Sequence, residues 1–164
     1  MQEITPFLWF DGNLEEAVNF YTTVFPNAHV ESMNPMTATS VIEGQEFMAL
    51  NGGPQFKFSE AVSFSIRCDT QAEIDYFGKR FTADGGVESQ CNWLKDKFGL
   101  SWQVVPNVLG RYLGGPDREG AQRVMQAMRR CTHLSSLKSS AGLFYEAWYK
   151  SFFHRFHRVC RPRF

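Results

Sequence analysis

Hydrophobic and polar positions along the first half of the chain predict a group of five short elements. Runs rich in β-branched and aromatic residues predict strands, and apolar residues at helical spacing predict a helix after the first strand. The predicted order is a strand, a helix and three strands, at residues 4–10, 14–25, 29–33, 37–42 and 46–50. Asn13 directly precedes the helix, where its side chain can cap the first turn.

The same order of elements begins again after a Gly-Gly-Pro loop at residues 52–54. Asp69 or Thr70 can cap the second helix, and Asp96 and Gly99 are typical of a turn between the last two strands. The predicted elements are a strand, a helix, a short extended segment and a final strand, at residues 61–68, 71–83, 91–94 and 100–105.

This repeated order predicts an α+β protein built from paired βαβββ modules. One module alone leaves the helix-free face of its sheet uncovered, and pairing two modules closes a curved sheet around a shared cavity. A plain α+β sandwich without a cavity is the alternative. We predict one domain over residues 1–106, followed by a helix within residues 107–130 that packs on the domain or on a dimer partner.

Charged residues are unevenly distributed between the first 130 residues and the tail. The net charge is zero, yet residues 131–164 hold six basic residues and only one acidic residue, Glu146. Apolar residues between 144 and 159 have helical spacing, and a basic aromatic helix of this kind binds partners, membrane surfaces or nucleic acid. The abrupt change in composition after residue 130 is also what a shifted reading frame would produce, so a non-native tail is the second hypothesis.

The composition of the chain argues against a membrane-spanning or secreted protein. The chain has no apolar run of 18 residues and no basic segment typical of a signal peptide at its start. Its four cysteines are widely scattered, without a CxxC pair. We expect a cytoplasmic protein with reduced thiols, whose first 130 residues bind neither nucleic acid nor membrane.

Several short motifs resemble one known family. They occur in order through both modules and the following helix: Leu8-Trp9-Phe10-Asp11-Gly12, Phe25-Pro26-Asn27, Ala49-Leu50-Asn51-Gly52-Gly53-Pro54, Asp96-x-Phe98-Gly99, Ser101-Trp102-Gln103-Val104-Val105-Pro106 and Arg123-Val124-Met125. The chain resembles the PhnB-like branch of the vicinal oxygen chelate superfamily, which includes glyoxalases, bleomycin-resistance proteins and dioxygenases. Members of this branch often carry the name 3-demethylubiquinone-9 3-methyltransferase.

The resemblance implies a homodimer and, in active members, a divalent metal held by His and Glu side chains on the inner strands. This chain has Leu8 and Trp9 where a ligand histidine is expected, Asn51 after the fourth strand, and Gln103 where a glutamate is expected. Amide oxygens are weak, uncharged ligands. We therefore predict no catalytic metal and no cofactor, and the alternative is a glyoxalase- or dioxygenase-type metalloenzyme with unusual ligands.

The sequence has no motif typical of the methyl-donor site that the methyltransferase name implies. A methyl donor usually needs a glycine-rich loop between a strand and a helix, whereas Gly52 and Gly53 lead into residues 55–58, which do not have a helical pattern. The leading hypothesis is a small-molecule-binding protein or an enzyme of unknown specificity. An interaction protein that uses the aromatic tail is a third class.

The candidate ligand-binding residues have aromatic, polar or nucleophilic side chains near the predicted pocket: Trp9, Asn51, Glu60, Cys91, Ser101, Trp102 and Gln103. Ser101 and Gln103 share one face of the last strand, which lines either a polar pocket or solvent. Trp9 and Trp102 could stack on a planar ligand, and core or dimer-interface packing is the alternative.

The other three candidates have equally simple structural interpretations. The Asn51 amide could contact a ligand carbonyl or shape the following turn. Glu60 could act as a general base or be a solvated surface carboxylate. Cys91 could be a nucleophile or an inert buried thiol. The sequence identifies no catalytic residue among them.

Overall fold

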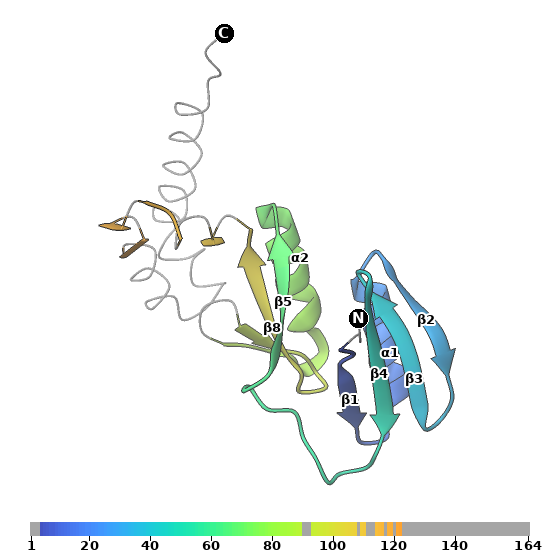
Figure 1. Ribbon diagram of the computed structural model, residues 1–164. Helices are drawn as coiled ribbons and strands as arrows, with labels where there is room; N and C mark the ends of the chain where they lie inside the picture. Colours follow the sequence, from blue (N-terminus) through green and yellow to red (C-terminus); the bar gives the residue numbers. More distant parts are fainter. Residues whose placement is uncertain are drawn as a thin grey trace.

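The computed structural model describes residues 4–89, 93–107, 109–110, 114–116, 118–119 and 121–122. These residues form two four-stranded sheets, each accompanied by one helix (Figure 1). The arrangement confirms the predicted α+β fold of paired βαβββ modules. The predicted helix within residues 107–130 lies largely outside the described residues, and the tail from residue 131 lies entirely outside them.

The first module contains β1 (Phe7–Phe10), α1 (Leu14–Val24), β2 (Ala28–Met33), β3 (Thr37–Ile42) and β4 (Gln45–Asn51). The strands lie in the order β1-β4-β3-β2, with β1 parallel to β4 and the other pairs antiparallel. The second module contains β5 (Ser63–Cys68), α2 (Gln71–Phe81), β6 (Val87–Glu88), β7 (Trp93–Lys95) and β8 (Ser101–Pro106), in the order β5-β8-β7-β6. The two-residue strand β6 was not predicted, because two residues are too short for an alternating pattern.

Two local predictions in the first module were wrong. The first strand begins at Phe7 rather than residue 4, because Pro6 has no N–H and contributes only its carbonyl, which accepts from the Met48 amide. Asn13 occupies the position before α1, but its side chain makes no capping hydrogen bond. The Asn51 side chain at the end of β4 accepts from the Leu14 amide instead, at 3.2 Å.

The start of α2 is as predicted. The Thr70 hydroxyl accepts from the Glu73 amide, and the Glu73 carboxylate accepts from the Thr70 amide in return. This reciprocal pair satisfies donors that a helix N-terminus otherwise leaves unpaired. Of the predicted apolar face, Ile74 and Phe81 are buried and Phe77 is partly buried.

The helix-facing sides of the two sheets share one aromatic core. The Phe81 and Trp102 rings stack at 4.7 Å, Phe25 of the first module lies 5.6 Å from Trp102, and Phe47 lies 5.2 Å from Phe64. Because these contacts join the helix-facing sides, the helix-free faces of the two sheets (here called the open faces) are turned outward. The two sheets therefore do not form the single curved sheet that pairing predicted within one chain.

Within the part of the chain that the structure describes, no helix has both the length and the apolar character needed to cross a bilayer.

Candidate functional site

The open face of the second sheet carries a row of hydrogen-bonding and aromatic side chains. Gln103 on β8 lies opposite Ser65 on β5 and Trp93 on β7, and directly opposed residues present their side chains on the same face. The Gln103 Nε2 group donates to the Ser63 hydroxyl at 2.7 Å, which orients the amide. Gln103 and Trp93 are half-buried, whereas Ser65 is exposed. Gln103 is thus a candidate residue on a face that a ligand can reach.

The charged groups on this face differ in their pairing. Lys95 forms an ion pair with Glu60, and its hydrogen bond is the main reason that the pKa of the Glu60 carboxyl is lowered. A carboxylate held in its ionised form by a lysine is a weak base, so the ion pair favours a surface role for Glu60. Arg67, two residues beyond Ser65 on the same strand, is exposed.

Trp9 occupies the open face of the first sheet, where β4 and the following loop hold it in place. Its indole Nε1 donates to the Gly53 carbonyl at 2.8 Å, and the Phe56 ring is nearly perpendicular to the indole, with the two ring centroids 5.0 Å apart. A Cβ on Gly52 would overlap the six-membered ring of the indole. Gly52 therefore serves close packing of Trp9 rather than a phosphate or methyl donor, and the chain beyond it continues without a helix up to β5.

Both polar atoms of the Asn51 side-chain amide form hydrogen bonds within the protein. Its Oδ1 accepts from the Leu14 amide, and its Nδ2 donates to the Pro35 carbonyl at 2.9 Å. The parallel pairing of β1 with β4 brings the end of β4 beside the start of α1, which explains this contact. Asn51 thus joins three segments of the first module.

Trp102 and Ser101 are buried, with 3% and 1% of their surfaces exposed. Trp102 lies on the helix-facing side of β8, where the Phe81 ring stacks on it. It is therefore part of the aromatic core and does not line either open face. Cys91 lies outside the described residues.

Asp96 was interpreted as a turn residue, and the structure gives it a second role. Its Oδ1 accepts from the Phe98 and Leu100 amides at 2.9 and 3.0 Å, which forms the predicted turn. Its Oδ2 accepts from the Tyr21 hydroxyl and the Trp102 indole, both at 2.8 Å. Because Tyr21 lies on α1, this buried carboxylate joins the two modules.

Burial and hydrogen bonding act in opposite directions on Asp96. Burial raises the pKa of its carboxyl, and the four donated hydrogen bonds lower it in part. The pKa of Tyr21 is raised well above its usual value by burial and by the nearby Asp96 charge, so its hydroxyl remains a donor. The available sequence signal was Tyr21 on the apolar face of the first helix, since a buried tyrosine hydroxyl needs a partner.

Cys68 should resist alkylation in the native protein. Burial is the main cause that raises the pKa of its thiol to about 11, so little thiolate exists at neutral pH. We expect peptide mapping by mass spectrometry to find Cys68 unmodified after brief treatment with iodoacetamide at pH 8, and fully modified in denaturant. Rapid native modification would contradict its buried position.

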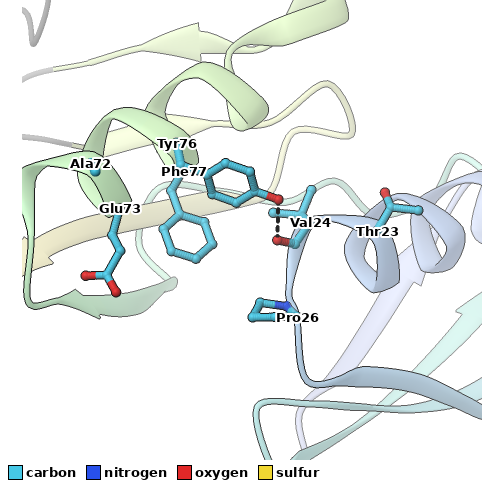
Figure 2. A pocket seen from close by; sticks show the side chains of 7 residues that line it. All are labelled: Thr23, Val24, Pro26, Ala72, Glu73, Tyr76 and Phe77. Atoms are coloured by element: carbon cyan, nitrogen blue, oxygen red, sulfur yellow. Dashed lines mark hydrogen bonds between the residues drawn. The ribbon is translucent and has the colours of Figure 1, made fainter.

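An apolar groove lies where the end of α1 and the residues after it meet α2 (Figure 2). It has a volume of about 410 Å³ and is lined by Thr23, Val24, Pro26, Ala72, Glu73, Tyr76 and Phe77. The Tyr76 hydroxyl donates to the Val24 carbonyl at 2.9 Å, and the Glu73 carboxylate is engaged at the start of α2. None of the candidate residues lines this groove.

The described residues contain no group of three or more His, Cys, Asp or Glu side chains placed to hold a metal ion. Leu8 is buried in the core, Trp9 packs on Gly52, and the Gln103 amide bonds to Ser63. His29 lies exposed on β2, at the far edge of the first sheet from β1. These side chains do not fit the His and Glu ligand set that the resemblance implies.

Comparison with known proteins decides the family. The profile of the family described as 3-demethylubiquinone-9 3-methyltransferase matches residues 2–105. This chain belongs to that family. A PhnB protein from Bacillus cereus that carries the same name is 32% identical, with a TM-score of 0.55 over 64% of this chain and 99% of that one. A comparison with curated protein sequences gives no match.

More distant solved structures show the same fold. A protein from Pseudomonas aeruginosa is 22% identical, with a TM-score of 0.51 over 65% of this chain and 98% of that one. The fosfomycin resistance protein FosX from Listeria monocytogenes, solved with Mn(II) and sulfate, is 14% identical, with a TM-score of 0.52 over 69% of this chain and 96% of that one. These structures share the fold of paired βαβββ modules. The resemblance to the PhnB-like family is confirmed by the family profile and by the Bacillus cereus protein.

Proposed function

We propose that this PhnB-like protein binds a small organic molecule on the open faces of its sheets, without a catalytic metal. The supporting observation is the row formed by Ser65, Gln103 and Trp93 across the second sheet. Small-molecule sites combine aromatic surface with a few oriented polar groups, and the bond from Gln103 to Ser63 provides such an orientation.

A homodimer would complete this site. The open faces of one chain are turned outward, so a second surface is needed to enclose a ligand against either of them. The first sheet exposes 55% of Phe7 and 38% of Met48, and both side chains lie on its open face. Burying exposed apolar side chains between two copies would favour association. We expect light scattering after size exclusion to give twice the chain mass, and a monomer at all concentrations would contradict this part of the proposal.

The metal-free part of the proposal rests on the donor set. FosX was solved with Mn(II). In this chain the residues at the expected ligand positions have tryptophan, leucine and amide side chains, and the described residues contain no group of three or more His, Cys, Asp or Glu placed to hold a metal. We expect elemental analysis of the purified full chain, after dialysis against Mn²⁺ or Zn²⁺ and gel filtration, to find no stoichiometric divalent ion. One equivalent of bound metal would instead favour a metalloenzyme with unusual ligands.

Ligand binding can be tested through the tryptophan side chains. We expect a fragment library screened by NMR of ¹⁵N-labelled indoles to give compounds that shift the Trp93 signal and leave the buried Trp102 signal in place. Gln103→Leu removes the oriented amide. It should lower the affinity for these compounds about tenfold, which corresponds to the loss of one hydrogen bond to the ligand. Gln71→Leu on α2 is the matched control and should bind normally. If no compound in the library shifts the indole signal of Trp93 or Trp9, the result would argue against the proposed function.

A further inference from the structure

We infer that Arg67 makes the open face of the second sheet selective for a planar aromatic carboxylate. This inference rests on the proposed function, and it adds the chemical class of the ligand. Arg67 follows Ser65 by two residues on β5, so both side chains lie on the open face. Phe64, Ile66 and Cys68 alternate with them and pack toward the core.

The charge available to a ligand on this face comes from Arg67. The two ion pairs among the described residues join Lys95 to Glu60 and Lys97 to Glu16, so the lysine on this face is already neutralised. Arg67 is exposed and forms no ion pair within the described part of the chain. A single uncompensated guanidinium complements one negative charge, and its planar fork matches the two oxygens of a carboxylate.

The spacing of the strands gives the size of the ligand. Trp93 lies two strands away from Ser65, or about 10 Å, and Arg67 lies about 7 Å further along β5. The side chains of Arg67 and Trp93 reach part of the way across this separation. The gap that remains between them matches the length of a two-ring molecule. Val105, which pairs with Arg67, supplies an apolar surface between them.

The chemistry of these groups favours an aromatic ring system with a carboxylate at one end. The Trp93 indole offers a face or edge for ring contact, and the Ser65 hydroxyl can donate to a carboxylate oxygen next to the guanidinium. A phosphate dianion is less well matched, because sites for such groups usually combine several cations or backbone amides. A neutral ring compound would make the Trp93 contact but would leave the guanidinium without a partner.

The test compares two probes that differ only in charge, 2-naphthoate and 2-naphthamide, titrated into the full chain while the Trp93 indole signal is followed by NMR. A Trp93→Phe variant identifies that signal. We expect naphthoate to bind at least tenfold more tightly than naphthamide. Arg67→Gln should abolish this preference and leave naphthamide binding unchanged, whereas Lys79→Gln, on the exposed side of α2, should keep the preference.

The outcomes separate the inference from the proposed function. Equal binding of the two probes, or a preference that survives Arg67→Gln, would overturn the inference and leave small-molecule binding intact. If neither probe shifts Trp93 but neutral fragments do, the inference also fails while the function stands. If no compound shifts Trp93 or Trp9, both fail.

Discussion

Replacing Asp96 with alanine is expected to lower the free energy of unfolding by about 3–5 kcal/mol. The carboxylate accepts four hydrogen bonds at 2.8–3.0 Å, and only 3% of the residue is exposed. Its removal leaves the Tyr21 hydroxyl, the Trp102 indole and two backbone amides without that acceptor. Urea denaturation at pH 7, followed by circular dichroism, measures the change.

Three variants separate the parts of this effect. Tyr21→Phe removes only the bond between the modules and should cost about 1 kcal/mol. Asp96→Asn keeps one oxygen acceptor but turns its amide N–H groups toward other donors. Its loss in the free energy of unfolding should therefore lie between those of Tyr21→Phe and Asp96→Ala. Asp11→Ala, at an exposed aspartate in the turn after β1, is the matched control and should be close to neutral. A loss below about 1 kcal/mol in Asp96→Ala would mean that the carboxylate contributes little beyond the turn.

Replacing Gly52 with alanine is expected to destabilise the protein by about 2–3 kcal/mol and to displace Trp9 from its position. The added Cβ would overlap the indole ring, which the hydrogen bond to the Gly53 carbonyl and the contact with Phe56 hold in place. The indole must therefore move, and the open face of the first sheet changes shape. Denaturation measures the stability, and the Trp9 indole signal reports the displacement.

Two controls distinguish the clash from a backbone effect. Gly53→Ala meets no atom within 4 Å, but Gly53 has a φ of +83°, so the cost should be about 1 kcal/mol from the left-handed backbone. In a Trp9→Ala background the obstacle is gone, and Gly52→Ala should then be nearly neutral. A full penalty in that background would show that Trp9 is not the cause.

The elements themselves could be predicted because their signals are local. The capping pair of Thr70 and Glu73 lies within four residues, and the first helix begins at Leu14 as its apolar spacing indicates. The Asn13 cap failed although its residue type was suitable, because Asn51, 37 residues beyond Leu14, provides the acceptor for the Leu14 amide. A contact across that separation depends on the parallel pairing of β1 with β4, which the local pattern does not contain.

The candidate site was predictable only by strand alternation. Because side chains alternate along a strand, the pattern alone puts Gln103 on the same face as Ser101, and β8 forms where that pattern predicts a strand. Trp102, its neighbour on the other face, has the same residue type as Trp9 and Trp93 but lies in the core. The row from Ser65 through Gln103 to Trp93 could not be predicted, because it depends on the register between three strands.

The sequence by itself determined the order of the elements, the repeat of the modules and the family, because hydrophobic periodicity, caps and short motifs act over a few residues. Only the tertiary structure decided which faces meet. It placed aromatic side chains from both modules, among them Phe25, Phe81 and Trp102, in one core and turned the open faces outward. It also made Asp96, a turn residue by its local pattern, the buried acceptor that joins α1 to β8. Burial and strand register are properties of the whole chain, since each depends on partners far apart in sequence.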